Sequence, residues 1–374
     1  MKKLLLASVA ASGLAFAAAP AHADIDLELG GYFKGYGVYV SQDESAGNSV
    51  NNFDIVRDTE LHVGGETTLD NGLTVGAHVE FKVDGEDGSA GNDESYAYFS
   101  GNWGRVNFGN EDGAGYLLQV AAPSADSNLD GIRQYVQPFN YGIMGTPAGL
   151  TTAVTAGGLD YDMDIAGKTD KITYLSPIFS GFQVGLSYSP DTDAANDLEG
   201  VGVDGVANTY DETYEVAARY EGQFQNVGVI VGAGFAQSNL GSNSNTASNP
   251  TDDRTAWNVG LDLNFGAFGL GAIYMEDDHG ETYVSATSTI DDEKTFVVGG
   301  DYTTGPFKLG LSYMNVNNTA NVQDLDTDRY TGGVTYEYGP GMTFRGSISY
   351  VDHENAAGTD FNGTAILLGT QVNF

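Results

Sequence analysis

Hydrophobic and polar residues alternate with a period of two along most of this chain. The clearest example is residues 73–84, where six apolar side chains alternate with polar residues or glycine. A helix cannot place residues i, i+2 and i+4 on one face, so the pattern predicts β-strands with two different faces. The same alternation recurs as far as residues 366–374 and predicts roughly sixteen strands.

The connections between the predicted strands alternate in length. Short turns containing glycine, proline or asparagine fall at residues 70–72, 101–104, 305–306 and 339–341. Long polar loops fall near residues 41–52, 190–211, 238–252, 277–293, 315–328 and 353–362. Short turns at one rim and long loops at the other are typical of outer-membrane barrels. We therefore predict an all-β protein, a transmembrane antiparallel up-and-down β-barrel of about 16 strands.

A soluble antiparallel sandwich or propeller would also show alternation, with its apolar face packed into a core. Two features favour the membrane barrel. The polar face is rich in glycine, and tyrosines lie at the ends of many apolar faces, as in the aromatic belts of membrane proteins. Most lysines and arginines share the polar face, and Arg57 and Lys294 break this register.

The first 23 residues have the features of a secretory signal peptide. Lys2 and Lys3 precede an apolar run, and Ala21-His22-Ala23 forms a small-x-small cleavage site. We expect residues 1–23 to be removed on export and residues 24–374 to form a single barrel domain. The chain has no cysteine, so disulfides cannot contribute to its stability.

The charge of the chain is strongly acidic. The formal net charge is -36 at pH 7, which argues against nucleic acid as a partner. High charge can indicate disorder, but 22 Tyr and 18 Phe are too many aromatic residues for a disordered chain.

Residues 101–113 carry a motif that links the predicted wall to a known family. They read Gly-Asn-Trp-Gly-Arg-Val-Asn-Phe-Gly-Asn-Glu-Asp-Gly. This resembles the Gly-x-x-Gly-x-Val-x-x-Gly-x turn and strand that lead into the third loop of the general porins of Gram-negative bacteria. Residues 365–374, which end on Phe374, resemble the outer-membrane assembly signal of the same family. Within this family, the sequence most resembles the porins of alphaproteobacteria.

The resemblance implies a homotrimer in the outer membrane of a Gram-negative bacterium, in contact with lipid and lipopolysaccharide. Each subunit would hold a water-filled pore for small hydrophilic solutes and ions. The third loop would be residues 111–168, folded inward to constrict the pore. The loop carboxylates expected at the constriction are Asp112, Asp126, Asp130, Asp160, Asp162 and Asp164. The wall residues expected there are Lys34, His78, Glu80, Lys82 and Arg105.

The expected mechanism is sieving by size and charge. Loop carboxylates facing wall cations would create a transverse field, which orients polar solutes and makes the passage of apolar ones costly. The family's dense cluster of wall arginines is not evident, because Arg105 is the single arginine among the wall candidates. This departure and the acidic excess predict a preference for cations. Two alternative functions are a substrate-selective channel and a structural or adhesin barrel with an occluded lumen.

No cofactor is expected, and calcium is an open question. Asp160, Asp162 and Asp164 have the spacing at which a calcium loop begins. The glycine at the sixth position and the glutamate at the twelfth are missing, so an EF-hand is rejected. Looser calcium binding by these carboxylates remains a hypothesis.

The sequence does not predict an enzyme. Beyond the signal peptide, the histidines that could act as general bases are His62, His78, His279 and His353. No Gly-x-Ser-x-Gly or His-Glu-x-x-His motif accompanies them. His62 and His78 fall on the polar faces of neighbouring predicted strands.

Overall fold

A computed structural model describes residues 25–44, 49–84, 91–122, 129–130, 133–134, 138–140, 161–192, 205–207, 209–242, 250–280, 283–285, 288–320, 323–354 and 360–374. Within these residues the chain is almost entirely β-structure, with one short helix, α1 (Ala114–Leu117). No helix in the described ranges is long and apolar enough to cross a membrane.

The strands follow one another along the chain with few interruptions. Their bounds are β1 (Asp26–Gln42), β2 (Phe53–Thr68), β3 (Thr74–Lys82), β4 (Gly91–Gly101), β5 (Gly104–Glu111), β6 (Leu129–Asp130), β7 (Arg133–Gln134), β8 (Thr169–Leu175), β9 (Phe182–Ser189), β10 (Tyr210–Phe224), β11 (Val227–Leu240), β12 (Arg254–Phe265), β13 (Phe268–Asp277), β14 (Tyr283–Ser285), β15 (Ser288–Thr304), β16 (Phe307–Ala320), β17 (Gln323–Gly339), β18 (Met342–Glu354) and β19 (Asp360–Asn373).

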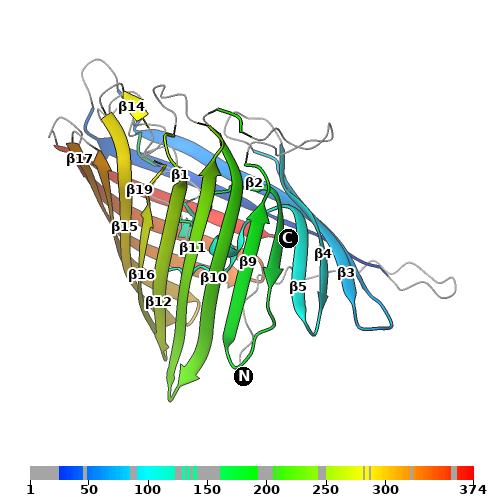
Figure 1. Ribbon diagram of the computed structural model, residues 1–374. Helices are drawn as coiled ribbons and strands as arrows, with labels where there is room; N and C mark the ends of the chain where they lie inside the picture. Colours follow the sequence, from blue (N-terminus) through cyan, green and yellow to red (C-terminus); the bar gives the residue numbers. More distant parts are fainter. Residues whose placement is uncertain are drawn as a thin grey trace.

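The main sheet closes into a barrel of tilted strands (Figure 1). It contains 17 strands, and without the short arm β14 the wall has sixteen, as predicted. Each wall strand is antiparallel to its neighbours, and β1 pairs with both β2 and β19. At this seam, Gly31 and Phe374 exchange two backbone hydrogen bonds of 3.0 and 3.1 Å. The closed wall therefore has no open edge strand.

Apolar side chains face outward and polar or small side chains face the lumen. On β12, Trp257, Val259 and Leu261 are exposed on the outer face, whereas the intervening Ala256 and Asn258 are buried inside. In the described part of the chain no second sheet covers the apolar face. The uncovered apolar face excludes the packed sandwich. It corresponds to the surface that lipid covers in an outer-membrane barrel.

Aromatic side chains form a band at each end of the outer face. Near the short turns, the ring centroids of Phe268 and Tyr302 are 4.8 Å apart. Toward the opposite rim, the ring centroids of Trp257 and Tyr274 are 5.2 Å apart. Two such girdles are expected where a barrel crosses the two interfaces of a bilayer.

Two basic residues that break the predicted register lie on the outer face with acidic partners. Arg57 Nη1 is 2.8 Å from Asp84 Oδ1, and Lys294 Nζ is 3.2 Å from Asp292 Oδ2. Both pairs lie toward the rim of the long connections. There a charge costs about 0–1 kcal/mol, far less than at mid-bilayer.

One predicted loop is wrong. Residues 315–320 and 323–328 are paired antiparallel strands, because β16 continues to Ala320 and β17 begins at Gln323. Asn315 donates side-chain hydrogen bonds of 2.7 and 3.0 Å to Asp326 and Asp328 on the facing strand. Asn315, Asp326 and Asp328 are residues common in loops, but here their side chains pair across the two strands. The predicted loop 277–293 is also shorter than expected, since β15 begins at Ser288.

Val259→Lys tests the assignment of the two faces. A lysine facing lipid near mid-bilayer costs about 2–4 kcal/mol, so we expect the free energy of unfolding to fall by that amount. Asp262→Lys is the matched control, because Asp262 lies on the same strand and faces the lumen. Urea unfolding in lipid vesicles, followed by tryptophan fluorescence, measures both variants. Equal losses would contradict the assignment.

Candidate functional site

After β5 the chain turns into the barrel and is bound at once to the inner wall. The backbone N–H of Ala114 donates to Ser187 Oγ on β9, and that of Gly115 donates to Glu215 Oε2 on β10, both at 2.8 Å. Both acceptor residues are buried. These bonds satisfy N–H groups at the start of α1 that have no partner within the helix.

Glycines on the facing strands make room for this segment. A Cβ atom on Gly260 of β12 would lie 2.8 Å from Val120 Cβ, and one on Gly232 of β11 would lie 2.7 Å from Val120 Cγ2. A Cβ atom on Gly185 of β9 would lie 3.0 Å from Ala114 Cβ. These glycines of the polar face therefore allow the loop to approach the wall backbone closely.

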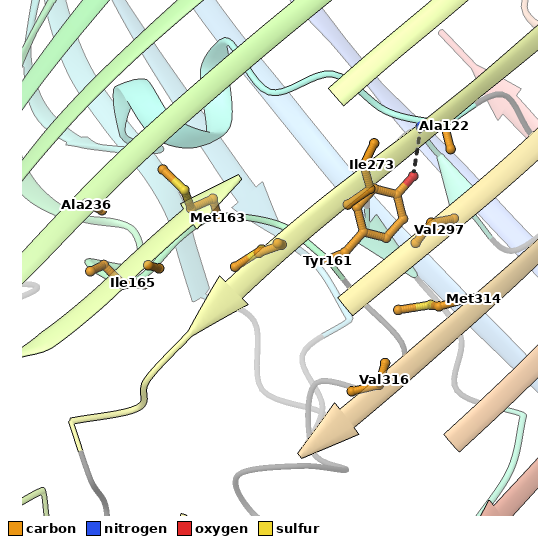
Figure 2. Close-up of a cluster of buried hydrophobic side chains, with 11 residues drawn as sticks. Ala122, Tyr161, Met163, Ile165, Ala236, Ile273, Val297, Met314 and Val316 are labelled. Atoms are coloured by element: carbon orange, nitrogen blue, oxygen red, sulfur yellow. Dashed lines mark hydrogen bonds between the residues drawn. The ribbon is translucent and has the colours of Figure 1, made fainter. Parts of the chain in front are cut away.

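The returning part of the loop packs on β11 to β16. Tyr161, Met163 and Ile165 join a buried apolar cluster with inward side chains of the wall (Figure 2). The wall side chains in this cluster are Ala236, Ala256, Ile273, Met275, Val297, Met314 and Val316. Gln119 joins the two halves of the loop, since its amide donates to Tyr161 O at 2.6 Å and accepts from Met163 N at 2.8 Å.

A third part of the loop lies against β1, β18 and β19. Phe139 is buried in a second apolar cluster with Val351 and Leu367. The next residue, Asn140, exchanges two hydrogen bonds of 2.9 Å with the side chain of Gln42. Among the described residues, the loop packs on the inner wall from β9 to β16 and from β18 to β1. Val56 of β2 packs at the edge of the second cluster, and no described side chain of β3 to β5 takes part in either cluster.

The inner face of β2 to β4 carries a dense group of titratable side chains. His62 on β2 lies opposite Glu80 on β3, and Glu80 lies opposite Glu94 on β4. Glu60 Oε1 is 2.8 Å from His62 Nε2, and Glu80 Oε1 is 2.8 Å from His78 Nε2. All five side chains are at least partly buried.

Lys168, at the end of the loop, reaches this wall. Its Nζ is 2.5 Å from Asp93 Oδ2 and 3.2 Å from Glu94 Oε1. Burial would lower the pKa of Lys168, but the carboxylates of Glu94, Asp112 and Asp93 outweigh it and raise this pKa above its usual range. Lys168 therefore stays charged and connects the loop to β4.

The predicted wall residues are divided between two levels of the barrel. His78, Glu80 and Lys82 lie together on the inner face of β3. Lys34 is buried on the inner face of β1, with Nζ 4.1 Å from the ring centroid of Tyr32.

Arg105 lies closer to the short turns, opposite Ser100. Its guanidinium carbon is 3.9 Å from the ring centroid of Tyr98, and its Nε donates to Asn107 Oδ1 at 2.6 Å. The structure thus separates Arg105 from the group on β3. The role of all five wall candidates at a constriction stays a prediction.

The predicted loop acids lie in different settings. Asp112 is buried just before α1, and Asp162 and Asp164 are partly exposed on the returning part of the loop. Of the others, Asp126 and Asp160 lie outside the described residues, and only the backbone of Asp130, in β6, is described. Their place at the constriction and the calcium hypothesis for Asp160, Asp162 and Asp164 stay predictions.

Sequence reasoning missed Glu60 and Glu94 and considered His62 only as a general base. Residues 54–68 alternate less clearly than the other strands, so the inward face of β2 was hard to recognise. The signal was present in the spacing Asp58-x-Glu60-x-His62, which places three polar side chains on one face.

These features define a class of protein, an outer-membrane channel whose closed β-barrel holds a loop inside its lumen. The sequence matches the Gram-negative porin family over residues 7–363, so the chain belongs to this family. The resemblance noted at residues 101–113 is thereby confirmed. No curated protein sequence matches the chain.

Solved structures with the same fold include several porins. An anion-selective porin from Comamonas acidovorans has a TM-score of 0.62 at 18% identity, covering 94% of this chain and 100% of that one. OmpT of Vibrio cholerae, in a trimer form, has a TM-score of 0.60 at 17% identity, covering 94% and 99%. A mutant of Rh. blastica porin has a TM-score of 0.54 at 18% identity, covering 93% and 100%. At these identities the likeness shows the fold.

Gly260→Ala tests how the loop is held against the wall. The new methyl group would overlap Val120, so we expect the free energy of unfolding to fall by about 1–3 kcal/mol and the loop to shift, which changes the conductance. Gly228→Ala is the matched control, because a Cβ atom there lies 3.4 Å from Asn264 Cβ, near ordinary contact. Chemical unfolding and single-channel conductance measure both effects. Identical behaviour of the two variants would show that Val120 does not press on Gly260.

Proposed function

We propose that this porin is a passive diffusion channel for small hydrophilic solutes and ions, with a preference for cations. The observation that carries the proposal is the uneven lining of the lumen. The described part of the loop packs on β9 to β16 and on β18 to β1, while no described side chain of β3 to β5 joins either apolar cluster. A polar wall facing a water-filled space allows hydrated solutes to pass. The process is physical and includes no catalytic step.

The preference for cations is supported by the charges on this wall. Its carboxylates include Asp58, Glu60, Glu66, Glu80, Asp93 and Glu94. The cations near them are Lys34, Lys82, Arg105 and Lys168. Lys168 is already paired with two carboxylates, so the remaining field is negative. Such a field attracts cations to the lumen and repels anions.

The Comamonas acidovorans porin is named as anion-selective. That selectivity belongs to a protein of 18% identity and is set by its own lining residues. Ion preference depends on a few side chains that differ freely between proteins of one fold. For this chain, the described wall charges favour the opposite sign.

We further propose that the subunits form a homotrimer embedded in lipid and lipopolysaccharide. Gly300, Gly332 and Gly346 lie in a shallow groove of about 840 Å³ on the outer face of β13 to β19. Apolar side chains such as Leu311 and Leu368 line it. Apolar side chains of a second copy would fill this groove. The trimer form of the Vibrio cholerae neighbour agrees with this arrangement.

Single-channel recordings in planar bilayers test both the channel and its selectivity. We expect stepwise openings and a reversal potential in a KCl gradient that favours K⁺. Glu66→Gln removes a lumenal carboxylate and should reduce the K⁺ to Cl⁻ permeability ratio roughly sevenfold at low salt, because a unit charge about 7 Å away stabilises K⁺ and destabilises Cl⁻ by about 0.6 kcal/mol each in water. Glu276→Gln is the matched control, since Glu276 lies on the outer face of β13.

Other outcomes would decide between the alternatives. Anion-selective openings would keep the channel and contradict the charge argument. A conductance that saturates with one solute would favour a substrate-selective channel. Folded protein without openings would favour a structural or adhesin barrel with an occluded lumen.

A further inference from the structure

Two imidazole rings and a carboxylate converge on the inner face of β2 and β3. His62 Nδ1 is 3.3 Å and His78 Nε2 is 2.8 Å from the same oxygen, Glu80 Oε1. The donor atoms of these three residues all lie within 4.8 Å of one another. The ring centroids of the two histidines are 5.7 Å apart and nearly perpendicular.

The strand register produces this convergence. His62 on β2 is the direct cross-strand partner of Glu80 on β3, and His78 precedes Glu80 by two residues on the same face. The residue opposite His78 is Gly64, which has no side chain to separate the two rings. Residues of one strand that share a face, and their cross-strand partners, lie within reach of long side chains.

Glu60 supports the second nitrogen of His62. Its Oε1 is 2.8 Å from His62 Nε2, and its Oε2 accepts a hydrogen bond of 2.9 Å from the hydroxyl of Tyr32. His62 Nε2 is buried and has no well-aligned hydrogen bond among the described residues. A carboxylate behind a histidine is the usual outer-shell arrangement for a metal-binding imidazole, because it orients the ring and raises its basicity.

We propose that His62, His78 and Glu80 bind a divalent transition-metal ion, with Zn²⁺ as the representative. Bonds of about 2.0–2.1 Å in a tetrahedral zinc site place neighbouring donor atoms about 3.3 Å apart, and the two nitrogens lie at 2.8 and 3.3 Å from Glu80 Oε1. The three side chains are 22%, 25% and 15% exposed, so water in the lumen reaches them. Three protein ligands leave the fourth position to water.

The donor set favours a transition metal over calcium or magnesium. Imidazole nitrogen binds Zn²⁺, Cu²⁺ and Ni²⁺, whereas Ca²⁺ and Mg²⁺ select oxygen ligands. An all-carboxylate set is also present at Glu60, Glu80 and Asp93. There, however, Asp93 already forms an ion pair of 2.5 Å with Lys168. The histidine set has no competing lysine in it.

Metal binding by the refolded full barrel is the direct test. Isothermal titration calorimetry with Zn²⁺, after treatment with a chelator, should show one site per subunit that prefers Zn²⁺ over Ca²⁺ and Mg²⁺. Co²⁺ should give the visible absorption of a site with mixed nitrogen and oxygen ligands. Glu60→Gln should weaken the affinity for Zn²⁺ about 10- to 100-fold. His62→Ala and His78→Ala should weaken it further.

His279→Asn is the matched histidine control. His279 lies in the turn after β13 with a φ of 49°, a conformation that asparagine tolerates. This variant should bind Zn²⁺ as the wild type does. Heat-modifiable mobility on gels checks that every variant is folded. Unchanged affinity in folded His62→Ala and His78→Ala, or equally tight binding of Ca²⁺, would overturn the proposal.

A recording in bilayers gives a second readout. Adding Zn²⁺ should reduce the K⁺ conductance of the wild type, because a cation bound on the inner face of β2 and β3 repels K⁺. The reduction should be absent in His78→Ala. The calorimetric result does not depend on conduction. Zn²⁺ binding without openings would therefore contradict the proposed channel and keep the metal site.

Discussion

Lipid offers no hydrogen bonds to the backbone, and the rest of the structure depends on this constraint. The wall satisfies its backbone groups by pairing every strand with two neighbours, and the seam between Gly31 and Phe374 completes the ring. Once the ring is closed, each side chain can point only to lipid or to the lumen. The apolar outer face and the polar inner face follow from the same alternation.

A barrel with a polar interior has no central apolar core, and the inward loop provides two local ones. One surrounds Tyr161 and Met163 on the wall from β11 to β16, and the other surrounds Phe139 on β1, β18 and β19. Glycine at positions such as Gly260 lets the loop lie directly on the wall backbone. The described part of the loop is therefore fastened to β9 to β16 and to β18 to β1, and the charged side chains on the inner face of β2 to β4 stay outside both apolar clusters.

Selectivity and metal binding would share this wall. Lys168 connects the loop to Asp93 and Glu94, and the histidine pair lies beside them on β2 and β3. The carboxylates of this wall would give the lumen a negative field, and a bound divalent ion would offset part of it. The same short stretch of wall would thus set which ions enter and how metal changes their passage.

The sequence by itself determined the strand number, the two faces and the membrane class, because alternation is local and each face meets a different solvent. The motif at residues 101–113 also located the start of the inward loop. The sequence could not distinguish the paired polar strands within residues 315–328 from a loop, since polar residues in paired strands and in loops have the same composition. Only the tertiary structure decided which wall the loop covers and that His62 lies opposite Glu80. Loop docking and strand register depend on contacts between segments that are distant along the chain.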